Sequence, residues 1–65
     1  MMQEKQKGPS TRVVIVDDHP AVCEALDQII RDQPDMEVCG VTTCGREALE
    51  MIRKEAPDVA VVDIV

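Results

Sequence analysis

Apolar residues gather in three short runs along this chain, separated by two stretches that have the period of an α-helix. The first run, over 12–16, holds four consecutive β-branched residues, and the last run lies at 59–62. Short apolar runs bounded by turn residues are typical of strands that are buried on both faces. A weaker alternation over 36–41 includes Gly40, a residue that is unfavourable inside a strand. We therefore predict three strands over these ranges.

The first helical stretch starts at Pro20, because proline is favoured in the first turn of a helix. It is expected to end before Pro34, since the residue that precedes a proline avoids the α conformation. Apolar residues within it recur at spacings of three and four, which predicts a buried stripe. This stripe comprises Val22, Ala25, Leu26, Ile29 and Ile30.

A second helix is expected over 45–55. Thr43 or Cys44 is the expected N-cap, and Glu47 stands three residues after Cys44, where the acid of a capping box would lie. The expected buried stripe of this helix comprises Ala48, Leu49, Met51, Ile52 and Ala56.

The order strand-helix-strand-helix-strand predicts an α/β fold with parallel strands and right-handed crossovers, which is half of a doubly wound sheet. A nucleotide-binding Rossmann half would need a Gly-rich turn after the first strand, but Asp17-Asp18-His19-Pro20 stands there instead. Residues 1–11 are polar, contain Gly-Pro-Ser and are expected to form a disordered tail.

Three acids follow the two most apolar strands. Asp17 and Asp18 end the first, and Asp63 ends the last. In open parallel sheets, ligands bind at the carboxyl ends of the strands, so these acids are expected to converge on a cation site. The alternative for Asp17 and Asp18 is N-capping of the following helix and favourable placement at its dipole, and for Asp63 a polar end to a strand. His19 is expected to be an exposed loop residue rather than a ligand, because hard cations prefer oxygen.

Composition narrows the class of protein. The chain has 65 residues, a net charge of −6 and no aromatic residue, so it can form one small domain, and its charge disfavours nucleic-acid binding. Its three cysteines are expected to be free thiols in a reducing cytoplasm. The sequence lacks a visible secretory signal, and its apolar runs are too short to span a membrane.

Three converging carboxylates repel one another unless a cation neutralises them. Mg²⁺ takes oxygen ligands, commonly one or two carboxylates, waters and a substrate phosphate. A carboxylate such as Asp63 can also attack phosphorus and carry the group as an aspartyl-phosphate. A magnesium-assisted phosphoacceptor is therefore one interpretation of these residues.

The motifs Val-Ile-Val-Asp-Asp-His-Pro, Gly-Arg-Glu-Ala-Leu-Glu and Ala-Pro-Asp-Val-Ala-Val-Val-Asp resemble, in this order and spacing, the receiver domain of bacterial two-component response regulators. The resemblance covers 12–65, and Asp-Asp-His-Pro looks most like regulators with a LuxR-type helix-turn-helix domain. It implies a flavodoxin-like, doubly wound parallel sheet, here with strand order 2-1-3. It further implies Asp63 as phosphoacceptor, Mg²⁺ held by Asp17, Asp18, Asp63 and the backbone carbonyl of Val65, and a sensor histidine kinase as phosphoryl donor.

The family pattern continues beyond residue 65 with a Pro-Gly loop, a Thr or Ser and a Lys. Residues 12–65 are therefore expected to be the N-terminal part of a receiver domain. The rest of that domain and the transcriptional effector domain would lie outside this chain. The strand at 59–62 would then have an open apolar edge, which predicts self-association.

Such a chain is expected to act as a signalling phosphoacceptor rather than as an enzyme. The first alternative is a non-catalytic interaction module that binds the sensor kinase or pairs with other receiver domains. A second, an aspartyl-phosphate hydrolase, needs another Asp two residues after the nucleophile, where Val65 stands.

Overall fold

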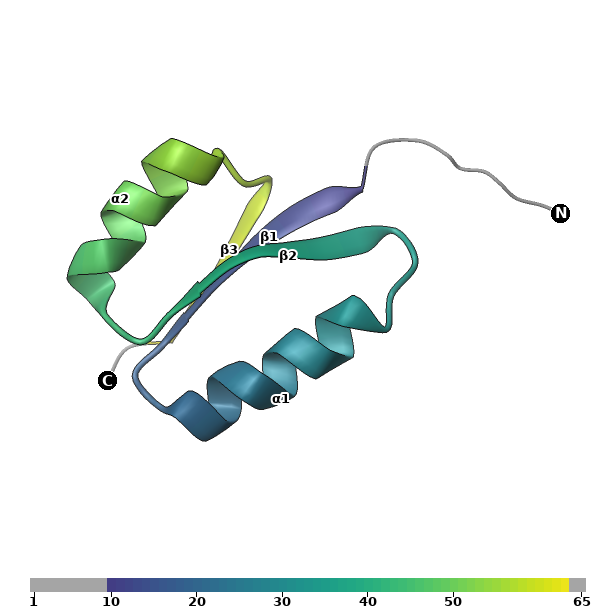
Figure 1. Cartoon of the computed structure of the whole chain (residues 1–65), viewed down its shortest axis with the longest axis horizontal. Coiled ribbons are helices and arrows are strands. Elements are labelled where there is room, and N and C mark those ends of the chain that lie inside the picture. Colours follow the sequence, from purple (N-terminus) through teal and green to yellow (C-terminus); the bar gives the residue numbers. More distant parts are fainter. Residues whose placement is uncertain (1–9, 64–65) are drawn as a thin grey trace, which may run out of the picture.

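Three parallel strands and two helices make up the computed structural model, which describes residues 10–63 (Figure 1). The elements are β1 (Thr11–Asp17), α1 (Pro20–Arg31), β2 (Met36–Thr42), α2 (Gly45–Glu55) and β3 (Val59–Asp63). The strand order is β2-β1-β3, with α1 and α2 on opposite faces of the sheet. This arrangement confirms the predicted α/β fold and the strand order 2-1-3. Within residues 10–63, no helix is long and apolar enough to cross a membrane.

The middle strand β1 forms the core. Its four β-branched residues Val13–Val16 are fully buried, as expected of a strand that is covered on both faces. Val13 and Ile15 pack with residues of α1 on one face of the sheet. Val14 and Val16 pack with residues of α2 on the other. The apolar run Val13–Val16 therefore contributes to two hydrophobic cores, one on each face of the sheet.

Helix α1 buries only part of the predicted stripe: Leu26 and Ile30 of that stripe pack inward, together with Cys23. The other residues of the stripe, Val22, Ala25 and Ile29, are exposed. Both sets have helical spacing, so periodicity alone cannot decide between them. The Cys23 thiol donates a hydrogen bond to the backbone carbonyl of Asp17 at 3.3 Å, which ties this face of the helix to the end of β1.

Helix α2 buries most of its predicted stripe. Ala48 is buried and Met51 and Ile52 are half-buried, but Leu49 is exposed. Ala56 lies outside the helix as its C-cap, with a left-handed φ of 47°, and its N–H donates to the carbonyl of Ile52. This left-handed cap directly precedes Pro57 and is a common way of satisfying the last carbonyls of a helix.

The N-terminus of α2 is held by Thr42 rather than by the predicted capping box. Cys44 is the N-cap but makes no side-chain capping bond. The Thr42 hydroxyl accepts a hydrogen bond from the Cys44 N–H at 3.1 Å and donates to Glu47 Oε1 at 3.1 Å. The Thr42 hydroxyl, at the end of β2, therefore links the Glu47 carboxylate to the backbone at the start of α2.

Strand β2 contains a bulge that breaks its alternation. The pairing with β1 passes from Val13–Val38 to Val14–Gly40, so that Cys39 is skipped. As a result Gly40 lies on the α2 face, where a Cβ at this position would lie 2.5 Å from Met51 Sδ. The glycine that weakened the strand prediction is thus explained by the close approach of Met51.

Replacing Gly40 with Val is expected to lower the free energy of unfolding by about 1–3 kcal/mol, because the added methyl groups overlap Met51. In a Met51→Ala background, the same replacement should cost much less. A double-mutant cycle measured by urea denaturation tests this coupling. An equal cost of Gly40→Val in both backgrounds would contradict the proposed contact.

At the opposite end of the sheet, Arg12 joins three elements. Its guanidinium lies 3.0 Å from Glu55 Oε1 and also donates to the main-chain carbonyl of Glu55 at the end of α2. Its Nε lies 3.7 Å from Glu37 on β2. Its backbone exchanges hydrogen bonds with Asp58, just before β3. These contacts fix the amino ends of the strands and so help to set the positions of their carboxyl ends.

Candidate functional site

The candidate site lies where β1 and β3 end. Both strands run in the same direction and Asp17 is the register partner of Asp63, so the last residues of the two strands lie side by side. Asp18 follows Asp17 directly in the loop to α1. The pairing therefore brings all three predicted acids to the same edge of the sheet.

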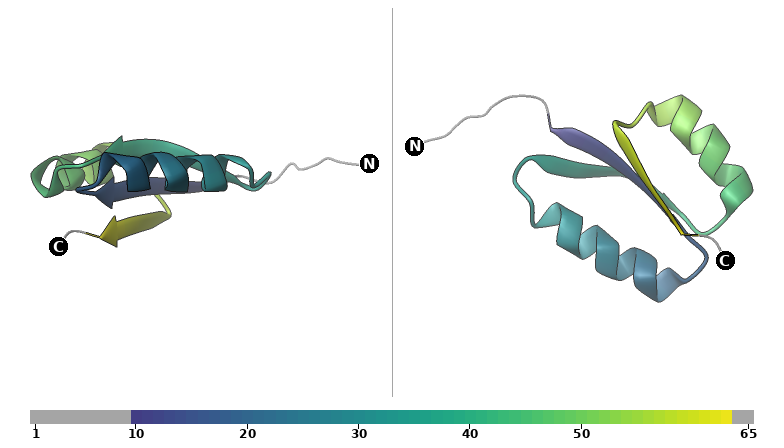
Figure 2. Two further views of the ribbon diagram at one scale, coloured as in Figure 1. Left: turned by 90° about the horizontal axis from the view of Figure 1, so that it is seen from below. Right: turned by 180° about the vertical axis from the view of Figure 1, so that it is seen from behind.

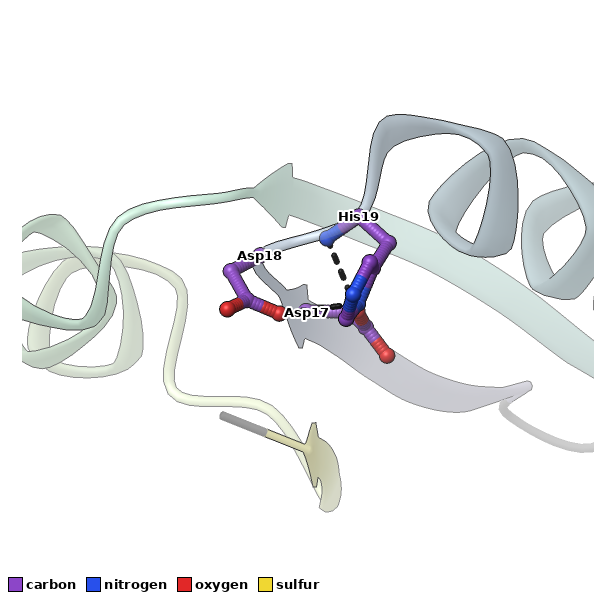
Figure 3. A group of neighbouring side chains, drawn as sticks. All are labelled: Asp17, Asp18 and His19. Carbon is purple, nitrogen blue, oxygen red and sulfur yellow. Dashed lines mark hydrogen bonds and ion pairs between the residues drawn. The ribbon is translucent and has the colours of Figure 1, made fainter. Parts of the chain in front are cut away.

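Asp17 is the most enclosed of these acids, with only 1% of its surface exposed. Its Oδ1 accepts a hydrogen bond from the backbone N–H of His19 at 2.9 Å and lies 2.9 Å from His19 Nδ1 (Figure 3). Its Oδ2 is buried without a hydrogen-bond partner among residues 10–63. A buried carboxylate oxygen without a partner is costly, so Oδ2 is available for a ligand.

His19 lies between the two neighbouring carboxylates. Its Nδ1 is 2.9 Å from Asp18 Oδ1 as well as from Asp17 Oδ1, while its ring is largely exposed. The hydrogen bond to Asp17 and the charge of Asp18 raise the pKa of His19. Hydrogen bonds from the backbone and ring of His19 hold the pKa of Asp17 below its usual value. The imidazole thus lies between the two acids, and its protonated form carries a charge opposite to theirs.

The capping alternative for Asp17 and Asp18 is not observed. The N-cap of α1 is His19, and no side chain makes a capping bond there. The carbonyl of His19 instead accepts the N–H groups of Val22 and Cys23. Asp17 binds the loop, not the helix, so helix capping does not account for either acid.

Two contributors to this site were missed in the sequence. His19 was correctly predicted to be exposed, but its contact with both acids was not, although its position directly after them was a signal. Cys23 was counted only as a thiol, whereas its bond to the Asp17 carbonyl fixes the loop. The sequence carries no signal for this bond, because it depends on which face of α1 is buried.

The donor set fits a hard divalent cation. Ligand atoms of Asp17, Asp18 and His19 all lie within 4.8 Å of one another. Mg²⁺ prefers oxygen, so the carboxylates rather than the imidazole are suitable ligands. Asp63 lies beside Asp17 in the sheet but does not belong to this close group. The remaining predicted ligand, the carbonyl of Val65, lies outside the described residues.

Comparison with known proteins identifies the family. The response regulator receiver domain matches residues 13–65, nearly the whole chain. The chain therefore belongs to the receiver domain family of two-component response regulators. Receiver domains typically bind Mg²⁺, and the acid pair Asp17 and Asp18 is present here.

Individual relatives carry different names. The chain is 42% identical over 57 residues to a protein-glutamate methylesterase/protein-glutamine glutaminase of Pyrococcus abyssi. The aligned residues make up 88% of this chain and 16% of the relative. The chain is 39% identical over 54 residues to a Pseudomonas aeruginosa protein whose name proposes a transcriptional regulator, covering 83% of this chain and 26% of the relative. The chain thus spans about a quarter or less of the length of these relatives. No solved structure matches it significantly.

Proposed function

We propose that Asp63 is the phosphoacceptor of this receiver domain and that a sensor histidine kinase supplies the phosphoryl group. The observation that carries the proposal is the register pairing of Asp63 with Asp17, which sets a strand-end carboxylate beside an acid pair. Asp63 is exposed, as an acceptor that must meet another protein has to be. Histidine kinases are the general partners of receiver domains, so the chain's family supports this donor.

In the proposed phosphoryl transfer, one bond to phosphorus forms and one breaks. A carboxylate oxygen of Asp63 forms a bond to phosphorus, and the bond between phosphorus and the phosphohistidine nitrogen breaks. The electron pair of that bond stays on the imidazole of the kinase, which takes up a proton. The product is an aspartyl-phosphate, a mixed anhydride. Because both reactants are anionic, the approach requires neutralisation of charge.

Mg²⁺ is the cation that we propose for this neutralisation. Asp17 and Asp18 would hold it, together with Asp63 and the backbone carbonyl of Val65. The unpartnered Oδ2 of Asp17 supports this assignment, because a bound cation would satisfy it. When bound, the ion screens the charge of the phosphoryl group. His19 binds the other oxygen of this carboxylate, Oδ1, through its backbone N–H and its ring, and so orients the carboxylate.

We propose residues 12–65 as the N-terminal part of a receiver domain in a cytoplasmic transcriptional regulator. The Asp-Asp-His-Pro motif and the relative from Pseudomonas aeruginosa support transcription as the output. The methylesterase relatives favour a different output, modification of protein glutamate side chains, as the second candidate. The domain fused to the receiver in the full-length protein distinguishes the two.

Asp18→Asn is expected to weaken Mg²⁺ binding at least about tenfold, because it removes one charge from the acid pair. Titration with Mg²⁺ and beryllofluoride, a phosphoryl mimic, should shift the backbone NMR signals of residues 17–19 and 63. Asp35→Asn makes the same chemical change at an exposed turn and should leave the titration unchanged. Equal titrations for both variants, or shifts away from these residues, would exclude the proposed site.

A further inference from the structure

The acid pair has a nitrogen ligand beside it that is unsuited to Mg²⁺. His19 Nδ1 lies 2.9 Å from Asp17 Oδ1 and 2.9 Å from Asp18 Oδ1 (Figure 3). His19 is also the only histidine of the chain. An imidazole nitrogen is a common ligand of divalent transition metals, whereas Mg²⁺ prefers oxygen. The three side chains therefore offer a mixed set of one nitrogen and two carboxylates.

The spacing within this set fits the ligand separations of an octahedral ion. Metal–ligand bonds of about 2.1 Å place neighbouring ligands about 3.0 Å apart around an octahedral ion and about 3.4 Å apart around a tetrahedral one. Both distances from His19 Nδ1 are 2.9 Å, close to the octahedral value. An ion that replaces the Nδ1 proton, which passes to water, can therefore contact all three side chains with little movement.

The Asp17 carboxylate points independently to a bound cation. A hydrogen bond between neighbours accounts for Oδ1, which His19 holds, but Oδ2 is buried without a hydrogen-bond partner among residues 10–63. The Asp17 side chain is only 1% exposed, so its charge is poorly solvated. A divalent cation bound to this carboxylate neutralises the charge that both of its oxygens share.

His19 is fixed in position by the backbone on both sides of the loop. Its N–H donates to Asp17 Oδ1, and its carbonyl accepts the N–H groups of Val22 and Cys23 in the first turn of α1. The Cys23 thiol in turn donates to the Asp17 carbonyl. The His19 side chain is nevertheless 61% exposed, so an ion can reach it from solvent. A ligand held in place before binding loses little freedom when it binds.

We infer that His19 Nδ1 is the third protein ligand of a divalent transition metal, which binds at the acid pair more tightly than Mg²⁺. This selectivity rests on the proposed function, because Asp17 and Asp18 supply the other two ligands. The octahedral spacing favours Ni²⁺ and Co²⁺, which bind nitrogen and oxygen ligands more tightly than Mn²⁺ does. Because such an ion uses the same carboxylates as Mg²⁺, it competes with Mg²⁺ for the proposed site of phosphoryl transfer.

Isothermal titration calorimetry of the full chain with Ni²⁺ and with Mg²⁺ tests the inference. Ni²⁺ is expected to bind at least about tenfold more tightly than Mg²⁺, and added Mg²⁺ should weaken its apparent affinity. His19→Gln keeps the backbone N–H and carbonyl but lacks the ring nitrogen, so it should weaken Ni²⁺ binding at least about tenfold without weakening Mg²⁺ binding. Circular dichroism shows whether the variant is folded.

Cys44 provides the matched control, because a thiolate is the rival ligand for Ni²⁺. It is an exposed free thiol at the start of α2, and both helices begin at the edge of the sheet where β1 and β2 end (Figure 2). Cys44→Ser should bind Ni²⁺ as the unmodified chain does. Loss of Ni²⁺ binding in Cys44→Ser but not in His19→Gln would overturn the inference.

NMR of the unmodified chain with isotope-labelled histidine gives a direct readout, since His19 is the only histidine. Zn²⁺, a diamagnetic ion with flexible geometry, should shift the Nδ1 signal strongly and the Nε2 signal much less, whereas Mg²⁺ should leave both nearly unchanged. Unshifted ring nitrogens in the presence of Zn²⁺, or equal Ni²⁺ affinity of His19→Gln and the unmodified chain, would refute the inference while Mg²⁺ binding stands. Ni²⁺ binding through His19 without any Mg²⁺ binding would support it and refute the proposed function instead.

Discussion

Asp63→Asn is expected to reduce phosphoryl transfer to the chain at least about a hundredfold, to the background level. An amide oxygen carries no full negative charge and forms no stable acyl phosphate, so the proposed nucleophile is lost. The side chain hardly changes in volume and Asp63 is exposed, so the fold should be preserved. The measurement is incorporation of labelled phosphate from a phosphorylated histidine kinase or from acetyl phosphate, with Mg²⁺ present.

Controls separate the acceptor from other acids. Asp35→Asn, at an exposed turn, should accept phosphate as the unmodified chain does. The label should be released by hydroxylamine, which cleaves acyl phosphates, and should map to the peptide containing Asp63. Undiminished labelling of the Asp63→Asn protein would refute the assignment. If neither protein is labelled and both bind the kinase equally, the chain is an interaction module.

The strands were predictable because burial and sequence are directly linked there. A central parallel strand is covered on both faces, so the middle of β1 must be apolar at consecutive positions, and the four β-branched residues Val13–Val16 meet this requirement. The acids stand where that run ends, and the parallel order follows from the alternation of strands and helices. The position of Asp63 beside Asp17 is thus implied by sequence before any contact is known.

Features that depend on rotation or on single contacts were not predictable. Helix α1 carries apolar residues on two adjacent faces. The face that is buried holds Cys23, Leu26 and Ile30, and Cys23 on this face donates a hydrogen bond to the Asp17 carbonyl. The bulge at Cys39 moves Gly40 to the α2 face, which an alternating pattern cannot reveal. The bridging position of His19 depends on the loop conformation that its own backbone bond to Asp17 creates.

Two adjacent isoleucines of α1 provide the sharpest test of that rotation. Both belong to the stripe predicted from periodicity, yet Ile30 is 8% exposed and Ile29 is 59% exposed. Ile30→Ala is expected to lower the free energy of unfolding by about 2–4 kcal/mol, because it removes buried methyl groups next to Val13 and Ile15. Ile29→Ala is expected to change it by less than about 0.5 kcal/mol, since little of its contact area is buried.

Urea denaturation followed by circular dichroism measures the difference between the two variants. A domain of this size has little stability to lose, so Ile30→Ala could unfold it entirely. Ile30→Val and Ile29→Val then provide the same comparison, with about 0.5–1.5 kcal/mol expected for the first and almost none for the second. Because each pair shares its helix and its chemical change, helix propensity cancels and only burial distinguishes the members. Equal losses at both positions would mean that α1 buries the broader stripe, and the tie from Cys23 to the end of β1 would then no longer explain how the helix is oriented.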